Sequence, residues 1–139
     1  MKARGLFGTN ASEGLATTVQ GAPMDPAKFE RMKAAFERAG GTIDQSADAV
    51  RYLDMRGAEG LTLNAETMLL RPNPSASAVF EEFIHVGQFR RGRIDSSSGL
   101  LMEIEAAERL INNRKAWGIP SSETRATIDR LRGFREMLR

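Results

Sequence analysis

The residues whose types could do chemistry gather in one short run of the chain. It reads Phe80-Glu81-Glu82-Phe83-Ile84-His85-Val86-Gly87-Gln88. On a helix, Glu81 lies four residues and Glu82 three residues before His85, so both carboxylates can reach the imidazole. Gln88 extends this polar stripe by a turn, while the apolar neighbours predict a largely buried helix. Because each unpaired buried polar group costs about 1–3 kcal/mol, the stripe needs partners from another element.

Acidic partners are available on the next predicted helix. They lie in the run Met102-Glu103-Ile104-Glu105-Ala106-Ala107-Glu108. With Ile104 as the centre of the buried face, Glu108 falls inside that face and Glu103 and Glu105 fall at its edges. Three acids near one buried surface are unusual for a helix that only packs. For Glu103 and Glu108, salt bridges to Arg109 or to the C-terminal arginines are nevertheless favoured over ligation.

The spacing is similar to that of the zincin motif His-Glu-x-x-His, which has two metal ligands one turn apart and a glutamate between them as general base. The metal lowers the pKa of its bound water and polarises the scissile carbonyl, and the glutamate takes the proton. Here the motif is Glu81-Glu82-x-x-His85, with a carboxylate in place of the first imidazole. In thermolysin-like zincins a third ligand follows the second histidine by twenty residues, and twenty residues after His85 is Glu105.

Further runs extend this likeness along the chain. They are Leu70-Arg71-Pro72-Asn73-Pro74 before the helix, Glu103-x-Glu105-Ala106 after it, and then Lys115-x-x-Gly118-Ile119-Pro120. Over about residues 42–138 the chain resembles the zincin-like metallopeptidase toxin domains of bacterial Rhs, contact-dependent-inhibition and related polymorphic toxins. The Glu-Glu-x-x-His-x-x-Gln core is the most specific part of the resemblance.

The resemblance implies a metal-dependent peptidase in which Glu81, His85 and Glu105 hold a divalent ion. Glu82 would be the general base, and His85 counts with it among the catalytic residues. Zn2+ is the implied ion. A ligand set rich in carboxylates is, however, chemically harder than the sets zinc usually prefers, so another divalent ion is also possible. The implied protein is a secreted or injected antibacterial effector that acts inside the target cell. It would be a monomer with a protein or peptide substrate and a cognate immunity protein.

Two other functions fit the same residues. In a nuclease toxin, His85 and a glutamate would do acid–base work while Arg90, Arg91 and Arg93 hold phosphates. In a non-enzymatic module, the Glu-Glu-His-Gln stripe would be a buried hydrogen-bond network, with His85 inaccessible and every polar group paired. The peptidase instead predicts that His85, Glu82 and Glu105 converge in a cleft lined by an edge strand.

Composition narrows the chemistry further. The chain has no cysteine and one histidine, which excludes disulfides, thiol nucleophiles and metal sites with several histidines. No apolar run is long enough to span a membrane, and no signal peptide is expected. The net charge of +2 lacks the heavy basic stripe of a dedicated nucleic-acid binder, so composition does not favour a nucleic acid as partner.

The elements that must position these residues follow from caps and apolar spacing. A chain of 139 residues favours one domain, here residues 25–139, preceded by a Gly-rich lead-in or linker over residues 1–24. Asp25-Pro26 begins a helix that Gly40-Gly41 ends. The segment 46–56 fits a helix capped by Ser46 or a strand equally well.

Short strands are expected at residues 61–63 and 67–70, joined by a turn. Three helices follow, beginning near Ser75 or Ser77, after the 95–99 loop, and at Pro120. The second of these is expected to run to Gly118. The sequence thus predicts an α+β, mostly helical, zincin-like domain with a small central sheet of short strands and three C-terminal helices.

Overall fold

The computed structural model describes residues 15–17, 21–92 and 99–138. Its first half contains a small mixed sheet. The strand order is β1-β3-β4-β2. The antiparallel neighbours are β1 (Leu15–Thr17), β3 (Gly60–Asn64) and β4 (Thr67–Leu70), and β2 (Thr42–Asp44) runs parallel to β4. Short strands within a mostly helical chain confirm the predicted α+β class.

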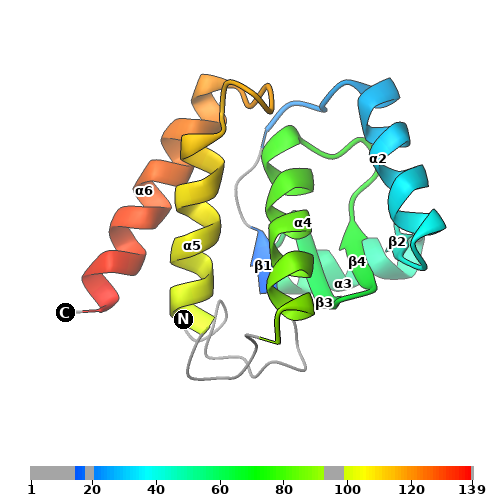
Figure 1. Ribbon diagram of the computed structural model, residues 1–139, viewed down its shortest axis with the longest axis horizontal. Coiled ribbons are helices and arrows are strands. Elements are labelled where there is room, and N and C mark those ends of the chain that lie inside the picture. Colours follow the sequence, from blue (N-terminus) through cyan, green and yellow to red (C-terminus); the bar gives the residue numbers. More distant parts are fainter. Residues whose placement is uncertain (1–14, 18–20, 93–98, 139) are drawn as a thin grey trace.

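Five helices are found among the described residues. They are α2 (Pro26–Arg38), α3 (Ala47–Arg56), α4 (Ala76–Arg90), α5 (Gly99–Asn112) and α6 (Ser121–Met137). Figure 1 shows α4 in the middle of the molecule, with α2 on one side and the α5–α6 pair on the other. The predicted three C-terminal helices are confirmed, but α5 ends at Asn112 rather than at Gly118.

Alternation along the strands creates two cores, one on each face of the sheet. Met68 and Leu70 pack into the cluster that α2 and α4 complete, whereas Leu61 and Leu69 pack with Leu53 of α3. Since side chains alternate along a strand, the neighbours of Leu61 in β3 face α4 instead. Those neighbours, Gly60 and Thr62, become part of the surroundings of the candidate site.

Caps explain why 46–56 is a helix rather than a strand. The Ser46 hydroxyl accepts a hydrogen bond from the Ala49 backbone N–H at 3.2 Å, and Gly57 ends α3 in the left-handed conformation at φ 63°. The same logic holds for α2, where the Asp25 carboxylate accepts from the Ala27 N–H at 3.1 Å.

Part of the predicted lead-in belongs to the folded unit. β1 pairs with β3 in the register Leu15↔Thr62, Ala16↔Leu61 and Thr17↔Gly60. Met24 is buried in the larger core, and its backbone N–H donates to the Pro74 carbonyl at 2.9 Å. Residues 1–14 and 18–20 lie outside the described residues.

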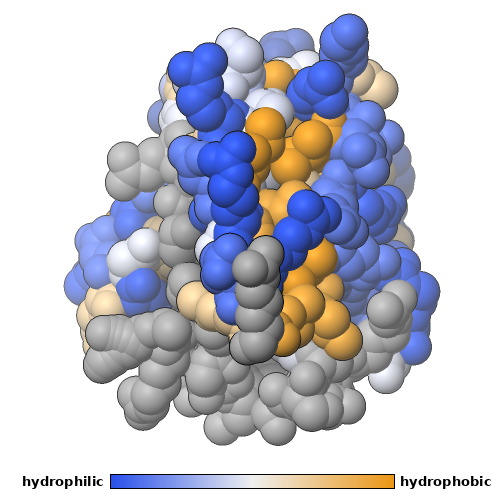
Figure 2. Space-filling model, turned by 90° about the vertical axis from the view of Figure 1, so that its left-hand side faces the viewer, coloured by the Kyte–Doolittle hydropathy of each residue, from blue (hydrophilic) through white to orange (hydrophobic). Residues whose placement is uncertain are grey.

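The helix pair α5–α6 forms one side of the molecule. α5 packs against both α4 and α6, and α5 is the principal neighbour of α6. Figure 2 shows a stripe of apolar residues between hydrophilic ones on this side, and the most exposed apolar side chains of the pair are Leu101, Met137 and Leu138. Among the described residues, no helix has both the length and the apolar character needed to cross a membrane.

Candidate metal centre

The polar stripe predicted on one helix is fully buried on α4. The Ser75 hydroxyl caps this helix by accepting from the Ala78 N–H at 3.1 Å. The sheet, α2 and α5 surround it, so Glu81, Glu82, His85 and Gln88 are each at most 1% exposed. Four polar side chains on one buried helix must be satisfied by one another or by neighbouring elements.

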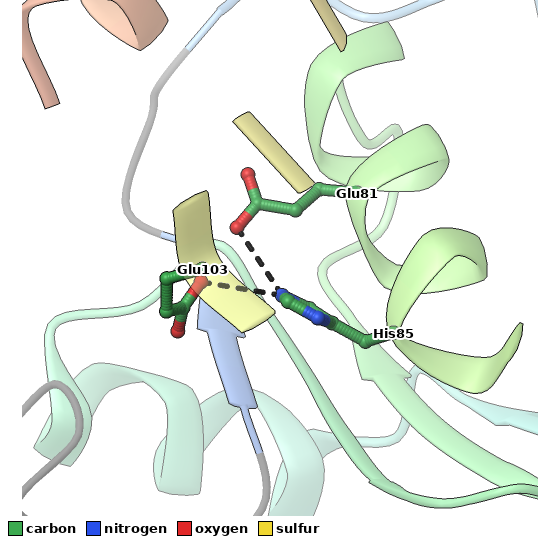
Figure 3. A group of neighbouring side chains, drawn as sticks. All are labelled: Glu81, His85 and Glu103. Carbon is green, nitrogen blue, oxygen red and sulfur yellow. Dashed lines mark ion pairs between the residues drawn. The ribbon is translucent and has the colours of Figure 1, made fainter. Parts of the chain in front are cut away.

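Two carboxylates from different helices approach the same nitrogen of His85. The Nε2 atom lies 3.5 Å from Glu81 Oε2, one turn away on α4, and 3.4 Å from Glu103 Oε1 on α5. Figure 3 shows the two carboxylates converging on this atom. One ligand atom from each of the three residues lies within 4.8 Å of the others, a grouping that could hold a metal ion. We call these three residues the Glu81–His85–Glu103 group.

Gln88 determines which nitrogen of the neutral His85 ring carries the proton and which carries the lone pair. The amide nitrogen of Gln88 donates to the Met102 carbonyl at 3.1 Å and to Glu105 Oε1 at 2.6 Å. Its Oε1 atom must therefore be the one that faces His85 Nδ1 at 2.7 Å, and Nδ1–H donates to it. In the neutral ring, Nε2 then carries the lone pair, as a metal-binding histidine requires.

No hydrogen bond satisfies the atoms at the centre of the group. His85 Nε2 and both carboxylate oxygens of Glu103 are buried and have no hydrogen-bond partner among the described residues. A lone pair facing two carboxylates is repulsive unless a positive charge lies between them. The arrangement therefore calls for a cation, which can be a proton on His85 or a metal ion.

The electrostatics of the group lead to the same requirement. Burial lowers the pKa of His85, but the charge and close approach of Glu103, and then of Glu81, raise the pKa well above its ordinary value. Burial raises the pKa of Glu81, but the charge of Arg130 and the contacts with His85 lower the pKa to about 2. Both shifts favour the ionised carboxylate and a positive charge beside it.

Arg130 of α6 supplies one positive charge at the edge of the group. Its two terminal nitrogens lie 2.9 Å from Glu81 Oε1 and 3.3 Å from Glu81 Oε2, and Nη2 lies 3.9 Å from Glu103 Oε1. The side chain is 14% exposed. Burial lowers the pKa of Arg130, yet Glu81 and Glu103 raise it above its ordinary value. The guanidinium thus stays charged beside the two carboxylates.

Glu82 faces the sheet beside this group. Its Oε1 and its backbone carbonyl accept from the Thr62 hydroxyl at 2.6 Å and 3.1 Å. Gly60 leaves room for the side chain, because a Cβ at this position would lie 3.0 Å from both Cγ and Oε2 of Glu82. Glu82 also acts through its charge on His85 and Arg130, which places its carboxylate near the Glu81–His85–Glu103 group.

The structure brings together most of the predicted site residues, with one difference. Glu81, Glu82 and His85 lie close together, but the third carboxylate at His85 belongs to Glu103. Glu105 lies beyond Gln88, where it accepts from the amide and lies 3.5 Å from Arg91 Nη2. It is therefore linked to His85 through Gln88.

The sequence pattern indicates Glu103 but does not place it at His85, and it does not single out Arg130. The salt bridge that it favours between Glu103 and a C-terminal arginine is found with Arg130, at 3.9 Å. Ile104 is not the centre of the buried face of α5: that face is formed by Gly99, Met102, Glu103, Ala106, Ala107 and Leu110. Small residues at positions 99, 106 and 107 were the available signal, since they let α5 approach its neighbours closely. Glu108, expected inside the face, pairs with Arg135 at 2.6 Å on the surface.

The basic run proposed for phosphate contacts lies apart from the imidazole. Arg90 and Arg91 are exposed at the end of α4, whereas His85 has no exposed surface. Arg90 lies over the Phe36 ring, with 6.0 Å from its guanidinium carbon to the ring centroid. Arg93 lies outside the described residues.

No protein-family model, curated protein or solved structure matches the chain. The geometry of the buried group is therefore the basis on which a function can be assigned.

Proposed function

We propose that the chain is a divalent-metal-dependent peptidase whose ion is held by the Glu81–His85–Glu103 group. The observation that carries the proposal is the cluster of buried polar atoms without hydrogen bonds: Nε2 of His85 and both oxygens of Glu103. Buried polar atoms are nearly always paired, so atoms left without a partner call for another ligand. A nitrogen lone pair and two carboxylates are donors that zinc accepts in proteins.

The formal charges of the site support an ion of charge two. Glu81, Glu82 and Glu103 are buried and contribute three negative charges when ionised, and Arg130 returns one positive charge. With His85 neutral, as ligation requires, two negative charges remain without compensation. Buried charges are strongly unfavourable unless they are paired, so a divalent cation suits this site better than a monovalent one.

The surrounding residues have distinct parts in the proposed hydrolysis. A bound divalent ion supplies Lewis acidity toward a carbonyl oxygen. Glu82, fixed by Thr62 and the space above Gly60, accepts the proton of the attacking water as general base. Gln88, itself held by Glu105, keeps the His85 ring in the tautomer that offers Nε2.

The proposal extends to the biological role implied by the resemblance to zincin-like toxin domains. On this view the chain is an antibacterial effector that cuts a protein or peptide in the target cell and is held inactive by an immunity protein. Expression of the wild-type chain in the bacterial cytoplasm should then arrest growth, and Glu82→Gln should abolish the arrest. Equal growth of cells with either chain would contradict the toxin role without bearing on metal binding.

A second candidate is a non-enzymatic module in which the same residues form a closed polar network. The observation that favours it is burial, because Glu81, His85 and Glu103 are at most 1% exposed and Arg130 already pairs with Glu81. That candidate requires every polar group to be hydrogen-bonded inside the protein, and His85 Nε2 and the two carboxylate oxygens of Glu103, which have no hydrogen bond, depart from this requirement.

Metal content of the purified protein separates the two candidates. After dialysis against zinc, manganese or nickel and then against buffer, the wild type should retain close to one equivalent of one of these ions, while His85→Ala and Glu103→Gln should retain little. Glu105→Gln is the matched comparison, since its carboxylate accepts from Gln88 rather than lying in the Glu81–His85–Glu103 group, and its loss should weaken binding without abolishing it. Absence of zinc, manganese and nickel from the wild type and every variant would refute metal binding and favour the non-enzymatic candidate with a closed polar network. Where metal binds, loss of peptide cleavage in Glu82→Gln with metal retained would assign the base.

A further inference from the structure

The geometry points to Arg130 as an internal cation that competes with the metal for Glu81 and Glu103 and so sets the affinity of the site. This inference rests on the proposed metal binding and adds to the site a residue that lowers the affinity for the metal. Arg130 Nη2 lies 3.3 Å from Glu81 Oε2 and 3.9 Å from Glu103 Oε1. These two oxygens are also the ones nearest to His85 Nε2, at 3.5 Å and 3.4 Å.

The guanidinium and a divalent ion cannot both keep these contacts at full strength. Two positive charges sharing the same carboxylate oxygens repel one another strongly in a poorly solvated site, where Coulomb interactions exceed their values in water. Entry of the metal should therefore loosen the contact between Arg130 and Glu81. Conversely, the Arg130 contact stabilises the buried carboxylates when no metal is bound.

The competition between Arg130 and the metal should affect the position of α6, the helix that carries Arg130. Its principal packing partner is α5. Two of its residues, Glu123 and Arg130, lie two turns apart on one face and make side-chain hydrogen bonds to α4. Glu123 Oε1 accepts from the backbone N–H and the hydroxyl of Ser77 at 3.1 Å and 2.6 Å. Arg130 makes the second connection, to Glu81. If the bond between Arg130 and Glu81 were broken, the C-terminal part of α6 would lose its contact with the buried carboxylates.

The inference also accounts for access to a buried site. The Glu81–His85–Glu103 group has almost no exposed surface, whereas Arg130 is partly exposed and reaches it from an outer helix. We infer that withdrawal of this side chain opens the group toward solvent, because Arg130 contacts both Glu81 and Glu103 from the outside. Arg130 thus links the state of the metal site to the position of α6.

Zinc affinity of matched arginine variants tests the competition. Arg130→Met keeps the apolar stem and removes the charge, and Arg132→Met, on the same helix but exposed and paired with Asp129, is the control. Affinity measured by competition with a chelating dye should rise at least tenfold in Arg130→Met and stay unchanged in Arg132→Met. Equal or weaker binding in Arg130→Met would overturn the inference while leaving the metal site intact. No zinc binding in any variant would overturn both.

A measurement on the wild type keeps the test decisive if Arg130→Met does not fold. Amide hydrogen exchange should slow in α4 when zinc is added and become faster in α6 around Arg130. Slower exchange in both helices would mean that Arg130 supports the bound ion rather than competing with it. That result would overturn the inference although zinc binds.

Discussion

Gln88 is the residue that makes His85 usable as a ligand. Both hydrogens of its amide are engaged, by the Met102 carbonyl and by Glu105, so its oxygen is left to accept from Nδ1 of His85. The ring is thereby fixed in orientation and tautomer without any metal. This is the kind of supporting contact that metal-binding histidines generally have.

Replacing Gln88 by leucine should therefore weaken both the fold and the site. The buried Nδ1–H would lose its acceptor, which predicts a loss of about 1–3 kcal/mol in the free energy of unfolding. Zinc affinity should fall roughly 10- to 100-fold. Urea unfolding and zinc titration would measure the two effects. Gln45→Leu is the control, because Gln45 is partly buried and bonds Lys33 and the Arg71 carbonyl outside the site. A similar fall in zinc affinity for both variants would refute the role given to Gln88.

The raised pKa of His85 predicts how stability depends on pH when metal is kept away by a chelator. A group whose pKa rises on folding adds stability below its unfolded pKa, and this stability is lost as the pH rises through the folded pKa. For His85 the unfolded value is near 6.5 and the folded value well above it. The difference in unfolding free energy between the wild type and His85→Gln should be largest below about pH 6.5 and shrink at higher pH. A difference that grows with pH would contradict the shift.

Sequence reasoning could find the residues of α4 and a set of candidate partners, but not which acid and which arginine contact them. Glu81, Glu82 and His85 share one helix, so spacing alone brings them together. The choice between Glu103 and Glu105 depends on the rotation of α5, which is fixed by packing of the small residues Gly99, Ala106 and Ala107. Arg130 could not be singled out, since five arginines lie in the last helix and its flanks and only the contact with Glu81 distinguishes this one.

The strand β3 has its own part in shaping the site. Its alternation directs Leu61 to the core beneath α3 and Gly60 and Thr62 toward Glu82 on α4. A side chain at position 60 would occupy the space that the Glu82 carboxylate needs. The glycine is thus required by close approach of a neighbouring helix rather than by backbone conformation.

Gly60→Ala should accordingly destabilise the protein and displace Glu82. The new Cβ would lie 3.0 Å from Leu70 Cδ2 and from two atoms of Glu82, all buried, so the expected loss is about 1–3 kcal/mol in the free energy of unfolding. Gly133→Ala on α6 is the opposite case, because no atom lies within 4 Å of its Cβ position, and a gain of about 0.5–1 kcal/mol is expected. Thermal and urea unfolding of the two variants would measure the expected loss of stability in Gly60→Ala and the expected gain in Gly133→Ala. An unchanged Gly60→Ala would show that Glu82 can move at no cost.

Local signals were sufficient for most helices and failed where tertiary contacts decide. Asp25, Ser46 and Ser75 each cap a helix through a side-chain oxygen, and such caps can be recognised from sequence. The strand β1 has three residues in a Gly-rich segment and no alternation to reveal it. Its existence depends on pairing with β3, about 45 residues further along the chain, which no local pattern encodes.

At the scale of the whole molecule, the folded unit therefore begins before the first helix. β1 adds a strand to the sheet beside β3 and also packs against α4, the helix that carries the site. Met24 fills the larger core, and Gly21 lies against Glu123, whose side chain would clash with a Cβ at position 21. The segment thus contacts the sheet, α4 and α6, three parts of the structure that surround the Glu81–His85–Glu103 group.

Removing residues 1–24 should consequently destabilise the whole protein. The truncated chain loses the β1–β3 pairing, the Met24 side chain and the hydrogen bond from Met24 to Pro74. Loss of a buried methionine alone predicts about 2–5 kcal/mol in the free energy of unfolding. A chain that begins at residue 15 keeps these described contacts and is the matched comparison. Urea unfolding should give a lower midpoint for the chain starting at residue 25 than for the one starting at residue 15, and zinc affinity should fall in parallel because β1 supports α4. Equal midpoints would mean that residues 25–139 are a complete domain and that β1 adds nothing to its stability.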